Sequence, residues 1–176
     1  MMEEKLRNFY ELFTRRKSVR DFSDRDIDND SLDRILEIGR RAPSAANCQP
    51  WHFIVLRKKD RKDFDELLKK NFSTAPVIII GCAEKEKAWV RKADSINYAW
   101  VDVTIALTEM VDSATAEGLG TCWIAAFDPE KVKTVLRIPP RIDVVAAIAM
   151  GYPKEPLIRE EKRRKDIKEI IHYNGW

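Results

Sequence analysis

The sequence predicts an α+β protein in which helices flank a central mixed β-sheet. Two observations predict this class. Apolar residues recur at helical spacing in several separate segments, which indicates amphipathic helices. Between them lie short, continuous apolar runs such as 77–80 and 144–150, of the kind that forms strands covered on both faces. The 176 residues contain no internal repeat or low-complexity segment, so we expect one domain spanning 1–176.

Apolar spacing and capping residues predict three helices in the first half of the chain. A stripe at i, i+3, i+4 and i+7 places the first helix at about 3–16. Ser31 is a candidate N-cap for the second helix, and Asp60 for the third. The apolar positions that define these helices are Leu6, Phe9, Tyr10 and Phe13 in the first, the inward-facing Leu32, Ile35, Leu36 and Ile38 in the second, and Phe64, Leu67 and Leu68 in the third.

A long helix is expected at about 94–117 and ends at Gly118. Its middle, 99–110, has little polar face, so this helix should be central or lie in an interface. Asp128 and Pro129 form the N-cap and N1 pair of a short later helix. The predicted strands are 51–56, 77–80, 120–126 and 144–150, and the apolar residues 169–173 of the tail could add an edge strand to a partner's sheet in a symmetric dimer.

The composition argues against several classes of protein. Charged residues make up 35% of the chain but nearly cancel, and a net charge of +3 is too small to argue for nucleic-acid binding. Three cysteines without CxxC spacing and two histidines are a poor set of zinc ligands, and Cys82 and Cys122 fit a buried core. The N-terminus is charged and no apolar run approaches the length of a membrane span, so we expect a cytoplasmic protein with no membrane partner.

The loop 43–51, Pro-Ser-Ala-Ala-Asn-Cys-Gln-Pro-Trp, is unlike an ordinary connection. Its small residues and amides let a backbone approach a flat ligand, and Pro50 should hold Gln49 in an extended conformation. Cys48 invites a redox interpretation, but no resolving thiol is near it in the sequence, so a small residue that merely fits is the better hypothesis. His52 is better explained as structural than as a metal ligand.

A basic segment with a serine in it, 15–20, follows the first helix. One interpretation is a solvated helix C-terminus, where positive charge complements the dipole. The other is a phosphate site, because arginines offer forked donors and Ser18 offers a hydroxyl, while Val19 interrupts the charges with an apolar residue. A second basic run, 162–165, is typical of a solvated face or of a nucleic-acid-binding patch.

Together these segments resemble the nitroreductase family, FMN-dependent enzymes that pass electron pairs from NADH or NADPH to small acceptors such as nitroaromatics, quinones or flavins. The resemblance implies a homodimer with FMN at each of two subunit interfaces. Gly118-Leu119-Gly120 does not fit a Rossmann loop, since this G-x-G opens a strand instead of following one. The motifs that carry the resemblance, in the family's order, are R-x-S-x-R at 16–20, the loop 43–51, the segment 118–124, and the basic tail with its ending 172–176.

The resemblance implies roles for residues that bind the phosphate end of FMN. Arg16 and Ser18 would hold the phosphate or ribityl chain, with Arg15 as an alternative to Arg16. The tail, about 154–176, would wrap the partner subunit. Lys162 and Arg164 in it would complete the phosphate site.

The resemblance also places residues around the isoalloxazine. Arg20 would lie beside N1 and O2, where a cation stabilises the negative charge that two-electron reduction creates. A backbone N–H within 123–126 would donate to N5, the loop would contact the flavin from the other subunit, and no side chain need be catalytic. The implied cofactor-binding residues are Arg15, Arg16, Ser18, Arg20, Pro43, Ser44, Asn47, Trp123, Ile124, Ala125, Lys162 and Arg164.

Two features depart from the family's pattern. Ala125-Ala126 stand where better-known members have glutamate and glycine, and only the charged connection 84–92 stands where larger members insert helices. The substrate pocket should therefore be more open, or roofed by residues such as Trp89 or Trp100. The alternatives are a specialised flavoenzyme of the same fold, such as a dehalogenase, an FMN-binding protein without turnover, and a nucleic-acid-binding protein that uses the basic clusters.

Overall fold

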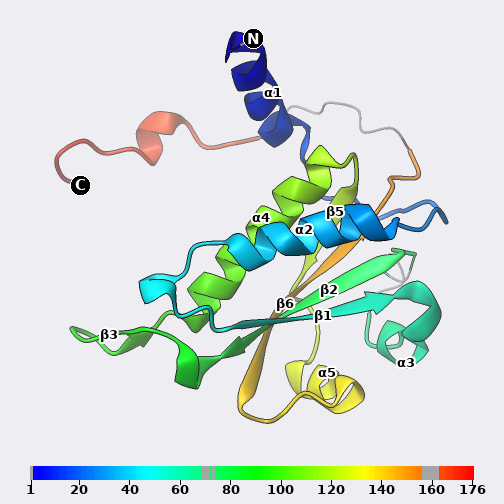
Figure 1. The fold of residues 1–176 in the computed structure, drawn as a ribbon. Coiled ribbons are helices and arrows are strands. Elements are labelled where there is room, and N and C mark those ends of the chain that lie inside the picture. The colour runs from blue at the N-terminus through cyan, green and yellow to red at the C-terminus, as the bar shows by residue number, and fades with distance from the viewer. Residues whose placement is uncertain (1, 69–71, 73, 156–162) are drawn as a thin grey trace.

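The computed structural model describes residues 2–68, 72, 74–155 and 163–176. A four-stranded sheet in the order β1-β2-β6-β5 separates α2 and α4 on one face from α3 and α5 on the other (Figure 1). The predicted α+β class is confirmed. The elements are α1 (Met2–Arg15), α2 (Asn29–Arg41), β1 (Trp51–Arg57), α3 (Lys62–Asp65), β2 (Val77–Glu84), β3 (Val90–Arg91), β4 (Ile96–Asn97), α4 (Ala99–Ala116), β5 (Gly120–Ile124), α5 (Pro129–Leu136) and β6 (Ile142–Gly151).

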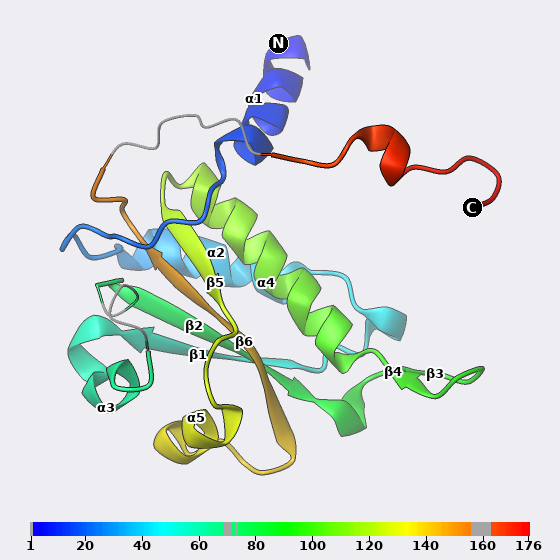
Figure 2. The same cartoon turned by 180° about the vertical axis from the view of Figure 1, so that it is seen from behind.

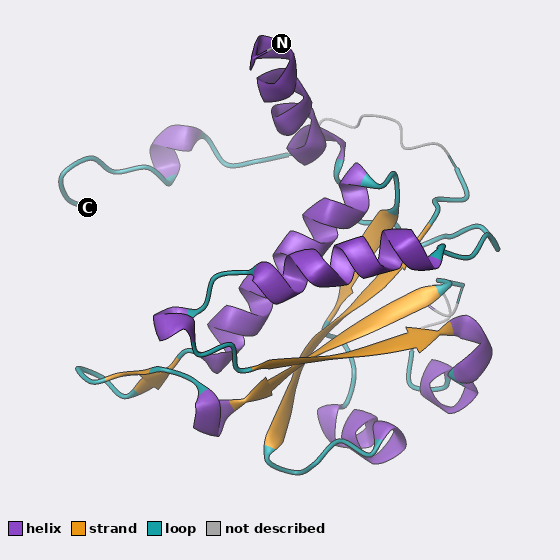
Figure 3. Cartoon of the chain, in the orientation of Figure 1, coloured by secondary structure: helices purple, strands orange, loops and turns teal. Residues whose placement is uncertain are grey.

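The sheet is antiparallel between every pair of neighbouring strands (Figure 3). Helix α4 connects β2 to β5, which run in the same direction, but β6 lies between them and opposes both. We expected a mixed sheet. Among the described residues, the one parallel pairing is an isolated bridge between Ser18 and Thr121, at the outer edge of β5. This bridge places the basic segment beside the sheet.

The core is built around α4 and β2. All eight residues of β2 are buried, as its continuous apolar run predicts. A Cβ on Gly81 would lie 2.6 Å from Cδ1 of Leu107, and a Cβ on Gly39 would lie 2.0 Å from Cε of Met110. Glycine at these two positions lets β2 and α2 approach α4 closely, so α4 is central as expected.

Four local predictions need correction. Helix α2 is capped by Asp28, which accepts a hydrogen bond from the Ser31 amide at 2.8 Å, so Ser31 lies inside the first turn. Ile38 on this helix is 40% exposed, because its side chain lies away from the stripe that meets α4. Asp60 ends a short 3₁₀ helix and does not cap α3. Helix α4 begins at Ala99, because the residues before it form the hairpin β3–β4. The expected pair of Asp128 and Pro129 does begin α5.

Helix α1 and the tail extend from the rest of the chain (Figure 2). The predicted stripe of Leu6, Phe9, Tyr10 and Phe13 forms, yet these side chains are 47–62% exposed and none of the described residues of α1 is buried. The residues 169–173 were expected as a strand, but Glu169 ends a 3₁₀ helix (Ile167–Glu169), 170–173 follow it, and all five are exposed. The apolar face of α1 and the apolar residues of the tail are therefore not buried by any other described part of the chain.

Candidate functional site

The basic segment lies against the edge of β5. The Val19 amide donates to the carbonyl of Thr121 at 2.8 Å, and Ser18 pairs with Thr121 in the parallel bridge. A Cβ on Gly120 would lie 2.5 Å from Cγ2 of Val19, so this glycine lets the segment approach the strand. Because side chains alternate in extended backbone, Val19 is buried while Ser18 and Arg20 remain exposed. The apolar residue that interrupts the charges is thus the anchor of the segment.

The pKa values of Cys122 and Asp112 show which side chains of the basic segment lie near the edge of β5. Burial raises the pKa of the Cys122 thiol, and the charge of Arg20 and a hydrogen bond from Ser18 oppose that rise. Burial also raises the pKa of the half-buried Asp112 carboxyl on α4, and the charge of Arg16 opposes it. Arg16, Ser18 and Arg20 therefore gather where the C-terminal half of α4 meets β5. Forked guanidinium donors and a hydroxyl suit a phosphate-bearing ligand such as FMN.

The positions just past β5 complete this half of the site. Trp123 is half-buried and Ile124 is buried at the end of the strand, while Ala125 and Ala126 are exposed beyond it. Methyl side chains there leave the backbone accessible to a ligand. The backbone donor that we expect for the flavin would come from this stretch, where the exposed positions carry no acidic side chain, and it stays a prediction.

The loop 43–49 has an unusual backbone. Ala46, Asn47 and Gln49 have φ values of 50°, 57° and 50°, in the left-handed region. We expected Pro50 to hold Gln49 in an extended conformation, and this prediction is wrong. The Gln49 backbone amide donates to Ser44 Oγ at 3.0 Å, and its side-chain amide donates to the carbonyl of Asn47 at 3.1 Å. These bonds close the loop on itself and leave Pro43 and Asn47 exposed.

Asp102 on α4 anchors the loop, and the sequence analysis missed it. Its Oδ1 accepts a hydrogen bond from the Ala45 amide at 3.0 Å. The residue is 1% exposed, and its Oδ2 has no hydrogen-bond partner among the described residues. Burial raises the pKa of this carboxyl, and the bond from Ala45 opposes the rise. The available signal was one acidic residue in the otherwise uncharged stretch 99–108.

The two halves of the expected site lie at opposite ends of α4 (Figure 1). Asp102 anchors the loop near one end, and Asp112 lies close to Arg16 near the other. Ten residues of helix separate the two carboxylates by about 15 Å along the axis. Within one chain, Arg16, Ser18 and Arg20 lie beside the first residues of β5, and Pro43, Ser44 and Asn47 lie apart from them.

The remaining predicted residues add little within one chain. Arg15 is exposed at the last turn of α1. Arg164 is exposed in the tail, where its Nη1 donates to the carbonyl of Arg163 at 3.1 Å. Lys162 lies outside the described residues.

The outward face of α4 between the two halves carries one ionisable side chain, the half-buried Glu109, among apolar residues and threonines. Val101 is exposed, Ile105 is half-buried, and both threonines on this face turn their hydroxyls back to the helix. Thr104 donates to the carbonyl of Trp100 at 2.7 Å, and Thr108 donates to that of Thr104 at 2.8 Å. The hydroxyls are thus satisfied, and the face can be covered by another apolar surface.

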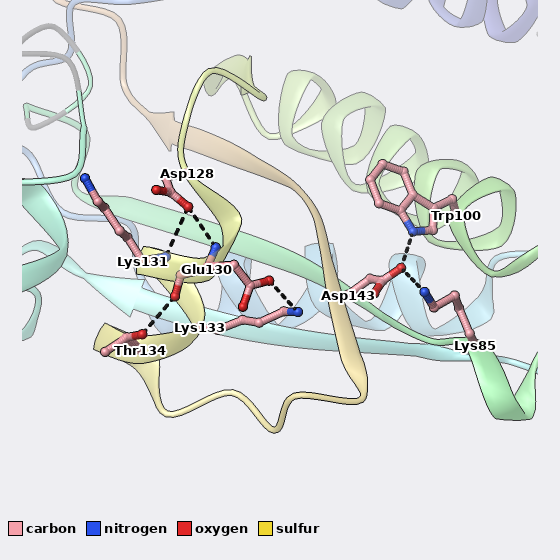
Figure 4. Close-up of polar contacts among 8 residues, drawn as sticks. All are labelled: Lys85, Trp100, Asp128, Glu130, Lys131, Lys133, Thr134 and Asp143. Atoms are coloured by element: carbon pink, nitrogen blue, oxygen red, sulfur yellow. Dashed lines mark hydrogen bonds and ion pairs between the residues drawn. The ribbon is translucent and has the colours of Figure 1, made fainter.

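Trp100 is held in place beside the loop end of α4. Its Nε1 donates to Asp143 Oδ2 at 2.9 Å, and Lys85 pairs with the same oxygen at 3.1 Å (Figure 4). Trp89, in the charged connection, packs edge-to-face on Tyr98 with ring centroids 5.1 Å apart. Both tryptophans remain partly exposed, so each is available as a wall for a ligand.

The family of the chain follows from its match to a protein-family model. The model of the Nitroreductase family matches residues 13–76 and 61–152. The chain belongs to the nitroreductase family. This nitroreductase-family chain is 32% identical to a protein of Archaeoglobus fulgidus named as an NADH dehydrogenase/NAD(P)H nitroreductase, over 99% of this chain and 100% of that protein.

Two further relatives agree. The FMN reductase [NAD(P)H] of Bacillus subtilis is 28% identical over 91% of this chain and 70% of its own length. The crystal structure of a nitroreductase family protein from Clostridium difficile 630 superposes with a TM-score of 0.86 at 28% identity, covering 94% of this chain and 98% of that one. The family resemblance inferred from the four motifs is confirmed.

Other kinds of site find no support in the part of the chain that the structure describes. No group of three or more histidine, cysteine, aspartate or glutamate side chains there could hold a metal ion. No described helix is both long and apolar enough to cross a membrane.

Proposed function

We propose that two copies of this chain form a symmetric dimer with two FMN sites, each built from both copies. The observation that carries this proposal is the separation of the two half-sites along α4. One copy would supply Arg16, Ser18, Arg20 and the backbone past β5, and the other would supply the loop with Pro43, Ser44 and Asn47. Lys162 and Arg164 of the tail would join the phosphate end.

A two-fold axis beside α4 would unite the halves. If two copies of α4 pack antiparallel, the end near Asp102 of one lies beside the end near Asp112 of the other. The apolar outward face of α4 and the exposed stripe of α1 supply the area for such an interface. Obligate dimer interfaces are large and hydrophobic, which agrees with an apolar face that one chain leaves uncovered.

The tail has a matching place in the dimer. The inner edge of β1 pairs with β2, and its outer edge has no ladder partner in the described part of the chain. Ile167, Ile170 and Ile171 give the tail an exposed apolar character. We propose that the tail of one copy wraps the other and adds a strand at this edge, which removes an open edge that would otherwise invite aggregation.

The function is that of an NAD(P)H-dependent FMN oxidoreductase, as the named relatives indicate. Bound FMN supplies the two-electron chemistry between the reduced nicotinamide and a small acceptor such as a nitroaromatic, a quinone or a flavin. Arg16 and Ser18 bind the phosphate end. Arg20 holds a positive charge beside the edge of the ring system where reduction places negative charge. No described side chain is needed as a nucleophile or general base.

The experiment is titration of the purified protein with FMN, then with NADH or NADPH, and then with acceptors. The proposal expects flavin absorbance that migrates with the protein, bleaching by a reduced nicotinamide, and recovery on addition of a nitroaromatic or a quinone. Recovery only with a halogenated aromatic would instead favour the dehalogenase alternative, and bleaching without recovery would favour an FMN-binding protein without turnover. A protein that fails to bind added FMN contradicts the proposal.

Arg20→Ala should weaken FMN binding by about 10- to 100-fold, the range expected for one hydrogen bond to a charged group. It should also make the bound flavin harder to reduce, since the stabilising cation is gone. The measurements are the FMN dissociation constant and the midpoint potential. Arg40→Ala is the matched control, because Glu37, on the surface of α2, is the one described residue with which Arg40 pairs. An unchanged potential in Arg20→Ala would remove Arg20 from this role.

A further inference from the structure

We propose a second ligand site, on the face of the sheet opposite α4, that binds a small planar carboxylate. A pocket of about 240 Å³ lies between β1, β2 and the connection from α5 to β6. Its floor is apolar, with Ile54, Cys82 and Ile142, and its rim carries basic side chains from His52, Arg137 and Arg141.

The floor is formed by neighbouring residues of the two strands. Trp51, Phe53 and Val55 of β1 pack toward α4, so the alternate residues His52 and Ile54 point to the other face. His52 pairs with Cys82 across the strands, which places the two side by side. Burial raises the pKa of the Cys82 thiol to about 11. Cys82 is therefore protonated and serves as part of an apolar surface, not as a nucleophile.

The rim has more positive than negative charge. Glu84, 5% exposed, is held by Lys87 at 2.7 Å, by His52 Nε2 at 3.0 Å and by Arg141 Nε at 3.4 Å. The bonds from Lys87 and His52 are the main cause of its pKa of about 2, so this carboxylate stays ionised. Arg137 and Arg141, which line the pocket, outnumber this one carboxylate, which leaves an excess of positive charge at the mouth of the pocket.

The two arginines have donors to spare. Arg137 makes no side-chain hydrogen bond or ion pair with the described residues, and the Nη groups of Arg141 have no partner among those residues either. Arg137 also has φ 54°, a left-handed conformation at the end of α5 that normally favours glycine. This turn ends α5 and starts the connection that lines the pocket together with Arg137.

The size and chemistry of the pocket select the ligand. Its volume lies below the roughly 300–1,000 Å³ of sites for drug-sized molecules, so one ring with one acidic group fills it. Guanidinium forks match the planar geometry of a carboxylate and can bind it with two parallel hydrogen bonds. The ring would lie on the floor of Ile54, Cys82 and Ile142, with its carboxylate at the arginines.

The experiment is a titration of FMN-loaded protein with benzoate, in which NMR records the signals of labelled isoleucine methyl groups. The proposal expects benzoate to shift the methyl signals of Ile54 and Ile142 and to leave those of Ile35 and Ile148, in the core of the α4 face, unchanged. Benzamide, which has the same shape without the charge, should bind at least about tenfold more weakly, since a charged hydrogen bond is lost.

Two arginine variants and one control locate the interaction. Arg137→Gln and Arg141→Gln should each weaken the benzoate-induced shifts by about tenfold in affinity. Arg40→Gln, an exposed arginine on α2, should leave them unaltered. The proposal is overturned if benzoate moves neither Ile54 nor Ile142, if benzamide binds as tightly as benzoate, or if binding persists undiminished in both variants. Because the readout is local to this face, failure here would leave the proposed FMN sites untouched.

Discussion

At the scale of the residue, two buried carboxylates have opposite environments. Burial raises the pKa of Asp102, which has one hydrogen bond from the Ala45 amide, whereas three basic partners lower the pKa of Glu84. Asp102 sets the loop that we assign to the FMN site, and Glu84 organises the basic rim of the second pocket. In the sequence, Asp102 stands alone in an uncharged stretch and Glu84 opens the charged connection 84–92, but only the fold shows which cations surround each carboxylate.

Asp102→Ala should weaken FMN binding and lower the free energy of unfolding by about 1–3 kcal/mol, because the Ala45 amide loses its acceptor. Asp102→Asn keeps an acceptor oxygen and is the control. The folded pKa of Asp102 lies above its ordinary value of 3.8, so its favourable contribution is complete below that pH and is lost as pH rises through the raised pKa. Chemical denaturation across pH should therefore show that the free energy of unfolding of the wild type falls relative to that of Asp102→Asn as pH rises. A difference that does not change with pH would contradict this.

Glu84→Gln should remove a part of the acid sensitivity of folding. The folded pKa of about 2 lies below the ordinary 4.5, so the ion pairs of Glu84 stabilise the fold above about pH 4.5, and this contribution is lost as pH falls toward 2. Thermal melts should show a lower Tm for Glu84→Gln than for wild type at pH 7, and a gap that narrows between pH 4.5 and 2. A gap that stays constant with pH would show that the charge of Glu84 is not the cause.

At the scale of the element, apolar periodicity and caps predicted most of the fold. The four strands and α1, α2, α4 and α5 follow from patterns that the structure retains. The cap of α2 was predicted at Ser31 and lies three residues earlier, at Asp28, because both side chains can accept an amide hydrogen bond and only the geometry shows which one does. The start of α4 was also beyond prediction, since the polar residues 90–97 pair with each other in a hairpin that has little apolar pattern.

Gly120→Ala should disturb both stability and the site. The new Cβ would lie 2.5 Å from Cγ2 of Val19, a side chain whose χ1 is stiff, so the basic segment must move from β5. We expect a loss of about 1–3 kcal/mol in the free energy of unfolding together with weaker FMN binding.

Gly175→Ala is the control for this substitution, because a Cβ there has no described atom within 4 Å. Denaturant titration and FMN titration of both variants make the comparison. If Gly120→Ala binds FMN as the wild type does, the contact between the segment and β5 does not position the phosphate site.

At the scale of the whole molecule, the central proposal is an FMN site that two copies share, because its two groups of residues lie at opposite ends of α4 in one chain. Family motifs supplied the residues Arg16, Ser18 and Arg20 and the loop residues, but no motif gives the distance between the two groups. Their separation along α4, the uncovered faces of α1 and α4, and the exposed tail all lead to the same symmetric dimer. The loop anchor at Asp102 and the basic pocket on the opposite face required the folded structure, because each joins residues far apart in the sequence.

Co-expression of two variants tests the shared site most directly. Arg20→Ala damages the half-site of its own chain, and Asn47→Asp places a negative charge in the half-site donated to the partner, while an aspartate tolerates the left-handed backbone at that position. In a mixed dimer, one site carries both changes and the other carries neither. Random pairing makes half of the dimers mixed, so about a quarter of all sites are intact.

The measurement is the NADH- or NADPH-dependent turnover of the co-expressed mixture with a nitroaromatic or quinone acceptor, compared with each variant alone. The dimer account predicts activity well above the mean of the two variants, rising toward about a quarter of wild type. Activity equal to that mean would contradict it, because it would show that Arg20 and Asn47 act within the same chain.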